Sequence, residues 1–175
     1  MKNASVHTLL VFIETYMLFI SHRGNVEGSL PEKENTISYI DDAVDLLNLD
    51  VMVDVIGIGG YLYLGTHTPK EKLPLEYLDS PKFWFHCNNP EALEYFKVFS
   101  KVKYFWHDED AYSLISNKKV LVHSGEILLP GSIALLPESN EHGHSLWNCH
   151  AVCTNYVFEY QKLYKEWNAL QNLLI

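Results

Sequence analysis

Short apolar runs recur along the chain, and each ends in polar residues or in glycine. The runs are rich in aromatic and β-branched residues, and most of them are too short to be helices, so the pattern predicts strands. Eight runs meet this description: residues 17–21, 51–56, 61–65, 83–87, 102–106, 120–123, 132–136 and 150–154.

Four other stretches have helical patterns. Residues 36–49 carry an apolar stripe at helical spacing, with Asn35 as the expected N-cap. The stretch 90–100 begins with proline, which a helix tolerates in its first turn. One or two helical turns are expected over 110–116, and the longest helical pattern covers 156–174.

Strands that alternate with helices are typical of a parallel sheet covered by helices. Eight strands favour a closed barrel, so we expect one α/β domain over residues 1–175, a compact (β/α)8 TIM-type barrel. Such barrels usually need about 250 residues. This chain has 175 residues, so several helices should be shortened or missing. An open, doubly wound sheet is the alternative.

Composition and charge narrow the class of protein. Apolar residues make up 47% of the chain and charged residues 20%, which is typical of a globular domain. The net charge of -9 argues against nucleic acid as a partner, because phosphate backbones recruit basic surfaces. The apolar run 8–20 is short and is interrupted by Glu14, so no transmembrane segment is expected. Three cysteines, an odd number, favour a reducing, cytoplasmic setting, and the oligomeric state stays open.

Polar side chains follow most of the predicted strands. In a barrel, the C-terminal ends of the strands meet at one mouth, where the chemistry of such folds takes place. The residues at these ends are His22, Arg23, Asp54, Thr66, His67, His86, Asn88, His107, Asp108, His123 and Asn155. We therefore expect a mouth rich in imidazole and carboxylate groups.

Two motifs near the N-terminus match a known pattern. His22-Arg23-Gly24 follows the first predicted strand, and Glu34-Asn35-Thr36 opens the first predicted helix. In both motifs and their spacing the chain resembles the glycerophosphodiester phosphodiesterase family, which is a family of PLC-like phosphodiesterases. Further matches lie in the stretches 52–54, 60–67, 84–89 and 104–108, of which the last two resemble a subgroup with short barrels. The resemblance covers roughly residues 21–156 and implies a barrel that cleaves a small phosphodiester.

The resemblance also implies roles for individual residues. Paired histidines suit acid–base catalysis near neutral pH, and hard cations prefer carboxylate oxygens. The implied catalytic residues are His22, His67, Arg23 and Glu34. The implied substrate contacts are Arg23, which meets the phosphate, Asn88, His107 and His123. The implied ligands of a divalent metal, Mg²⁺ or Ca²⁺, are Asp54, His86 and Glu34.

Four positions depart from the family pattern: Met52, Thr66, Asn88 and Asn155. Met52 replaces a metal-binding glutamate, and a thioether is a poor ligand for a hard cation, so the metal should bind weakly or be absent. Thr66 takes the place of the second catalytic histidine, and only a slip of one residue would let His67 serve. Asn88 and Asn155 stand where relatives often have lysine and aspartate.

These departures leave two hypotheses open. The first is hydrolysis or lyase-type cleavage of a small phosphodiester with a glycerol- or inositol-type head group. The second is a catalytically silent barrel that binds a phosphorylated ligand or a protein partner. A third hypothesis is a zinc site, for which the candidate ligands are His142, His144, Cys149, His150 and Cys153. Their spacing fits no standard zinc finger, so we expect a histidine-rich loop that leads into a buried cysteine.

Overall fold

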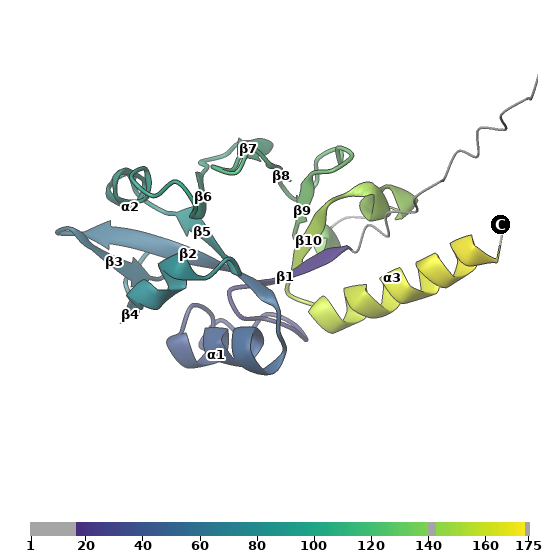
Figure 1. The fold of residues 1–175 in the computed structure, drawn as a ribbon, viewed down its shortest axis with the longest axis horizontal. Helices are drawn as coiled ribbons and strands as arrows, with labels where there is room; N and C mark the ends of the chain where they lie inside the picture. The colour runs from purple at the N-terminus through teal and green to yellow at the C-terminus, as the bar shows by residue number, and fades with distance from the viewer. Residues whose placement is uncertain (1–16, 140–142, 174–175) are drawn as a thin grey trace, which may run out of the picture.

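The computed structural model describes residues 17–139 and 143–173, and the remaining residues are drawn in grey in Figure 1. These residues form one mixed α/β fold, in which ten strands make a mostly parallel sheet that carries three α-helices. The predicted α/β class is thereby confirmed. None of the helices in the described parts of the chain is long and apolar enough to cross a membrane.

The parallel part of the sheet is an arc of neighbouring strands. These strands are β1 (Leu18–His22), β2 (Asp50–Ile58), β5 (Phe83–Cys87), β6 (Lys103–Trp106), β8 (Val120–Val122), β9 (Ile133–Leu135) and β10 (Ala151–Thr154). Their pairings give the spatial order β6–β5–β2–β1–β10–β9–β8. The first and last strands of the chain are therefore neighbours, and the C-terminal ends of all of these strands lie along the same edge.

An antiparallel hairpin extends this sheet. β3 (Tyr61–Leu64) pairs with the second half of β2, and β4 (Glu71–Lys72) pairs with β3. Gly59 and Gly60 form the two-residue turn with φ values of +61° and +80°. Glycine adopts such values at little steric cost, and they match the twist of a tight hairpin. The run 61–65 is thus a strand, as predicted, but it returns antiparallel and does not add a parallel strand to a barrel.

The strands do not close into a continuous ring, because the pairing is interrupted between β6 and β7. β7 (Tyr112–Leu114) pairs antiparallel with β8, and among the described residues no ladder joins β7 to β6. Instead the Ser116 N–H donates to the Tyr104 carbonyl at 2.9 Å, and the Tyr104 N–H donates to Ser116 Oγ at 3.0 Å. The structure therefore does not present a clearly closed (β/α)8 barrel. Strand–helix alternation fails at β3, β4 and β7, where strands follow one another through turns.

The core divides into one inner and two outer apolar clusters. The inner cluster gathers residues from every strand of the arc: Ile20, Met52, Trp84, Phe105, Ile115, Leu121, Ile133, Ala151 and Cys153. Side chains from both ends of the arc can meet only if the sheet curves around them. Side chains two positions apart share a face of a strand, so His22 follows Ile20 and Asp54 follows Met52 on the inner side. The alternation of side chains along a strand thus places the polar side chains of His22 and Asp54 next to the apolar inner cluster, toward the C-terminal ends of the strands.

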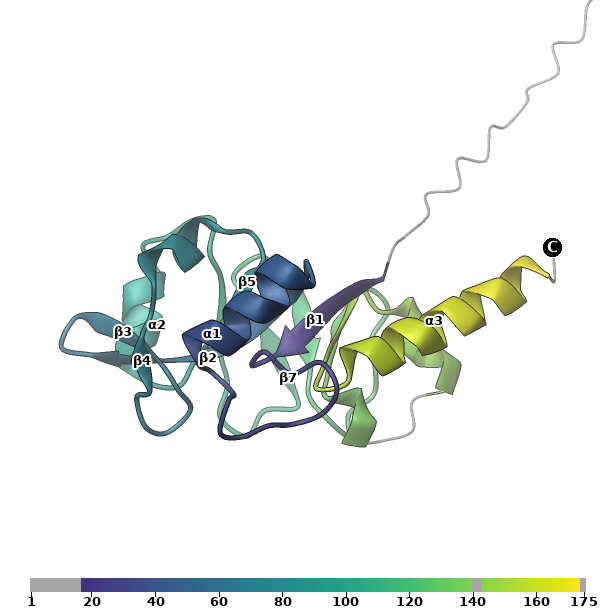
Figure 2. The ribbon, with the colours of Figure 1, turned by 90° about the horizontal axis from the view of Figure 1, so that it is seen from below.

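Helices cover the outer face of the sheet. α1 (Ile37–Asp41) and α2 (Pro90–Phe96) pack on the β2 and β5 side, where Ile40 and Phe96 are fully buried. α3 (Val157–Asn172) lies against β1. In Figure 2, α1 and α3 are seen on the same side of the sheet, with β1 between them.

Two local expectations about helices are wrong. Residues 110–116 contain β7 in place of helical turns, because this segment is held by its pairing with β8. Asn35 is not the N-cap of α1, since Thr36 holds that position and the Asn35 side chain bonds to Asp54. The expected proline at the start of the second helix is confirmed, as α2 begins at Pro90.

Candidate functional site

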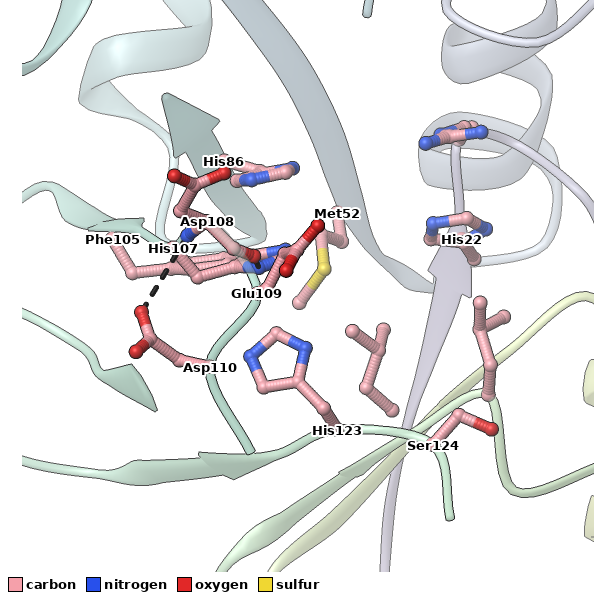
Figure 3. A pocket seen from close by; sticks show the side chains of 13 residues that line it. His22, Met52, His86, Phe105, His107, Asp108, Glu109, Asp110, His123 and Ser124 are labelled. Atoms are coloured by element: carbon pink, nitrogen blue, oxygen red, sulfur yellow. Dashed lines mark hydrogen bonds between the residues drawn. The ribbon is translucent and has the colours of Figure 1, made fainter. Parts of the chain in front are cut away.

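A pocket of about 400 Å³ opens at the C-terminal ends of the strands. It is lined by His22, Arg23, Met52, His86, Phe105, His107, Asp108, Glu109, Asp110, His123, Ser124, Leu135 and Leu136. Figure 3 shows His86, His107 and His123 on one side of the pocket and His22 on the other, with Met52 between them. The structure thus brings together four of the histidines that the sequence placed at strand ends.

The turn after β1 aims Arg23 at the site. Arg23 has a φ of +60°, its N–H donates to the Met52 carbonyl at 2.8 Å, and its own carbonyl accepts from Asn35 N–H at 3.2 Å. Gly24 follows with a φ of +95°, and a Cβ there would come within 2.6 Å of the Tyr39 ring. The His-Arg-Gly motif is therefore explained by local geometry, because only glycine fits after the left-handed arginine.

The Arg23 guanidinium lies between two carboxylates. Nη1 is 3.2 Å from Glu34 Oε2, and Nε is 2.6 Å from Asp54 Oδ2. The Nε hydrogen is buried and is not directed at an acceptor, so its contact with Asp54 is one of charge more than of hydrogen bonding. The predicted phosphate contact is thus already engaged with protein carboxylates, and among the described residues no hydrogen bond uses its Nη2 atom.

Asp54 is the most heavily bonded carboxylate of the site. Its Oδ2 accepts from Asn35 Nδ2 at 3.1 Å and from Thr66 Oγ1 at 2.7 Å, and its Oδ1 lies 2.8 Å from His86 Nδ1. Burial by itself would raise the pKa of Asp54, but the hydrogen bond to His86 and the charge of Arg23 hold that pKa far below its ordinary value. Asp54 is therefore ionised at neutral pH, and His86 donates to it from Nδ1.

Glu34 is held by the loop that precedes it. Its Oε1 accepts from Ser29 Oγ at 2.6 Å and from Asn25 Nδ2 at 2.8 Å. Burial opposes ionisation, yet these hydrogen bonds and Arg23 lower the pKa of Glu34. This arrangement fits the orienting role that the resemblance implies, and that role stays a prediction. The sequence reasoning missed Asn25 and Ser29, because nothing distinguishes them from other polar loop residues.

The ring orientation of His22 is set by the last strand. Its Nδ1 lies 3.0 Å from Asn155 Oδ1, and the same oxygen accepts from Asn25 Nδ2 at 2.9 Å. An amide oxygen only accepts, so the His22 Nδ1 carries the proton and its Nε2 carries a lone pair. Burial, and then the charge of Arg23, lower the pKa of His22, so the ring is neutral at neutral pH.

Three imidazoles form a row on the opposite side of the pocket. The His86 and His107 rings stack with centroids 4.6 Å apart, and the His107 and His123 centroids are 4.1 Å apart. His107 Nδ1 donates to the Asp108 carbonyl at 2.8 Å. Burial lowers the pKa of His107. Burial and the neighbouring histidines lower the pKa of His123 to about 4, so the His123 ring is neutral at neutral pH.

Four predicted site residues do not line the pocket: Glu34 and Asp54, which contact Arg23 at its edge, and His67 and Asn88. His67 is exposed and does not line it, while Thr66, one residue earlier, points to Asp54. Thr66, and not His67, therefore contacts the site. Asn88 donates from its side chain to the Gly65 carbonyl at 3.4 Å and ties the hairpin to β5, away from the pocket. The catalytic role of His67 and the substrate contact of Asn88 stay predictions that these positions do not favour.

The residues expected to hold a divalent metal do not fit one as they are arranged. Both Asp54 oxygens and both Glu34 oxygens are engaged by protein donors. In the part of the chain that the structure describes, no three His, Cys, Asp or Glu side chains are placed to share a metal ion. Met52, where the family has a carboxylate, is buried in the inner cluster, and its sulfur is 3.7 Å from Cys153 Sγ. The Met52 thioether is a soft ligand in apolar surroundings, so it is poorly suited to bind a hard cation such as Mg²⁺ or Ca²⁺.

The residues of the zinc hypothesis are not gathered either. His142 and the side chain of His144 lie outside what the structure describes. Cys149 belongs to an outer cluster and Cys153 to the inner one, on opposite faces of the sheet. These two thiols therefore cannot share one ion in this fold.

Comparison of the chain with protein-family models, with curated proteins and with solved structures finds no match in any of the three. The fold and the site by themselves define an α/β protein with an imidazole-rich pocket at the C-terminal ends of its parallel strands. The resemblance to the glycerophosphodiester phosphodiesterases therefore stays a prediction.

Proposed function

We propose that this protein cleaves a small phosphodiester by acid–base catalysis, with His22 and His86 as the two imidazoles. The observation that supports this proposal is that each ring uses its Nδ1–H on a fixed acceptor, which is Asn155 for His22 and Asp54 for His86. In both rings Nε2 is then the nitrogen available to a substrate. β2 separates β1 from β5, so the two backbones are about 10 Å apart, which leaves room for a phosphate group over Met52.

The two rings have different surroundings, which supports different roles for them. His22 is buried beside the Arg23 cation, which favours its neutral form, so it suits the base that takes a proton from the attacking hydroxyl or water. The His86 ring is oriented by its Nδ1–H on the Asp54 carboxylate, the arrangement in which a carboxylate positions an acid–base imidazole, so we assign His86 the role of the acid that protonates the leaving oxygen. The Nη2 amino group of Arg23 supplies donors for a phosphoryl oxygen.

The test is hydrolysis of a chromogenic phosphodiester by the full chain, with and without a chelator. We expect His22→Gln and His86→Gln each to lower turnover by about 100-fold or more, the usual contribution of a positioned acid or base. His67→Gln is the matched control, since it removes an exposed imidazole outside the pocket. Unchanged turnover in His22→Gln would refute the proposal. A loss in His67→Gln equal to that in His86→Gln would return the second role to His67.

A silent pocket that binds a phosphorylated ligand is the second candidate. Two observations favour a loss of catalysis: Met52, where the family has a metal-binding glutamate, lies in the apolar inner cluster, and Thr66, where the family has its second histidine, bonds to Asp54. This candidate predicts that small phosphate esters raise the melting temperature while no product forms. Turnover that depends on His22 would exclude it.

Three further proposals concern the setting of the site. We propose that the curved sheet is a shortened (β/α)8 barrel, and its support is the inner cluster that all strands of the arc share. A cytoplasmic, reducing location is supported by the three buried, unpaired cysteines. The net charge of -9 supports a small ligand in preference to nucleic acid.

A further inference from the structure

Arg23 occupies the space between the two carboxylates that the family resemblance assigns to a divalent cation. Its guanidinium reaches Glu34 Oε2 at 3.2 Å and Asp54 Oδ2 at 2.6 Å. We propose that the Arg23 guanidinium is the resident cation of this site and that it excludes a divalent metal. This inference deepens the proposed function, because it names the cation of the same site, and it is tested without measuring turnover.

The hydrogen-bond partners of the four Asp54 and Glu34 carboxylate oxygens support this assignment. Asp54 Oδ1 is bonded to His86, and Asp54 Oδ2 accepts from Asn35 and Thr66 beside its contact with Arg23. Glu34 presents Oε2 to Arg23, while its Oε1 is bonded within the preceding loop. A metal ion would therefore have to share each oxygen with a protein donor, and at Glu34 Oε2 and Asp54 Oδ2 it would meet the Arg23 cation.

The charge balance points the same way. The Asp54 side chain is 2% exposed and that of Glu34 is 10% exposed, so two negative charges are held with little contact with water. Buried carboxylates in close proximity repel each other unless a cation lies between them. A guanidinium suits this place because it is planar, always charged and only weakly hydrated.

The backbone prepares Arg23 for this role. The bonds from Arg23 N–H to the Met52 carbonyl and from Asn35 N–H to the Arg23 carbonyl hold the residue from both sides. Asn35 also bonds to Asp54 twice, once through each end of its side-chain amide. The arginine and its carboxylate partner are thus fixed by one shared network, and the left-handed φ of +60° at Arg23 is maintained by it.

The experiment is calorimetric titration of the chelator-treated full chain with Ca²⁺, Mg²⁺ and Mn²⁺. The variants are Arg23→Gln, which removes the charge at similar length, and Lys70→Gln as the matched control. Lys70 is a cation of the same neighbourhood, but its Nζ donates to the carbonyl oxygens of Pro31 and Glu34 and, among the described residues, forms no ion pair with a carboxylate. We expect no saturable binding by the natural chain or by Lys70→Gln. Arg23→Gln should bind a divalent metal saturably, with an affinity at least about tenfold above the upper limit for the natural chain. The reason is that the repulsion between the metal ion and the fixed Arg23 cation is removed.

Two results would overturn the inference. The first is saturable metal binding by the natural chain that Asp54→Asn abolishes. The second is a folded Arg23→Gln protein, judged by circular dichroism, that binds metal no better than the natural chain. If Arg23→Gln does not fold by itself, the inference predicts that Ca²⁺ restores the fold while sodium at equal ionic strength does not, and a failure of that rescue counts against it. None of these readouts depends on phosphodiester cleavage, so the inference and the proposed function can fail separately.

Discussion

The side-chain oxygen of Asn155 lies 3.0 Å from Nδ1 of His22, so the end of the last strand sets the tautomer of the histidine that ends the first. β1 and β10 are direct neighbours in the sheet, which is why residues 133 positions apart in sequence can meet. An amide fixes the ring but adds no charge, whereas an aspartate would also stabilise the protonated ring. The residue at 155 therefore contributes, after burial and Arg23, to how readily His22 holds a proton.

Replacement of Asn155 by aspartate should raise the pKa of His22. The carboxylate would favour the imidazolium and offset the effects of burial and Arg23, which lower that pKa now. Proton NMR titration of the His22 ring measures the change directly, and the acid limb of the pH–rate profile should move upward with it. Asn117→Asp is the control, because it adds the same charge on an exposed loop. An unchanged His22 titration would show that Asn155 does not govern this ring.

Acidification should destabilise the protein in the range set by His123. The pKa of His123 is lowered from 6.5 to about 4, so the unfolded chain binds a proton at a higher pH than the folded chain does. The free energy of unfolding therefore falls as the pH drops from 6.5 toward 4, and this residue causes no further loss below that value. With allowance for its partial exposure, the loss is about 1–2 kcal/mol.

Urea unfolding near neutral pH and at about pH 4.5 tests this linkage. His123→Gln should reduce the dependence on pH, and His67→Gln, which changes an exposed ring, should not. An equal dependence on pH in His123→Gln and the natural chain would assign the acid sensitivity to other groups.

Gly65→Ala should be strongly destabilising. Gly65 has a φ of +138°, and a Cβ there would lie 2.2 Å from the Thr68 carbonyl oxygen, a backbone atom that cannot move aside easily. We expect a loss of about 3 kcal/mol or more in the free energy of unfolding, from strain and displaced backbone. Gly59→Ala is the control, because Gly59 also has a positive φ but has no atom within 4 Å of such a Cβ. It should cost only about 1–2 kcal/mol, and equal losses in urea unfolding would contradict the argument.

Met52→Glu should lower stability without creating a metal site. Met52 is 3% exposed within the inner cluster, so a carboxylate there would be buried with no cation of its own. We expect a loss of about 2–4 kcal/mol, against less than about 1.5 kcal/mol for the volume-conserving control Met52→Leu. Calorimetry should show no gain in Mg²⁺ affinity while Arg23 is present. A gain in the single variant would mean that Met52, and not Arg23, is what keeps metal out.

The positions of the strands and of their polar ends could be predicted from the chain itself. A strand places alternate residues on one face, so Ile20 and Met52 indicate where His22 and Asp54 must lie. The eight predicted runs are all strands, and the second helix begins at its proline. The direction of the run 61–65 could not be predicted, because an apolar run carries no information about which strand it pairs with.

The sequence by itself therefore determined the α/β class, the strands of the arc and the gathering of histidines at one edge, since these follow from local periodicity and the geometry of parallel strands. Only the tertiary structure decided that β6 and β7 share no ladder, that His86 and not His67 lies in the pocket, and that Arg23 is paired with both Glu34 and Asp54. Each of these depends on contacts between segments distant in sequence. Such contacts are set by packing and charge across the whole fold, and no local pattern of residues encodes them.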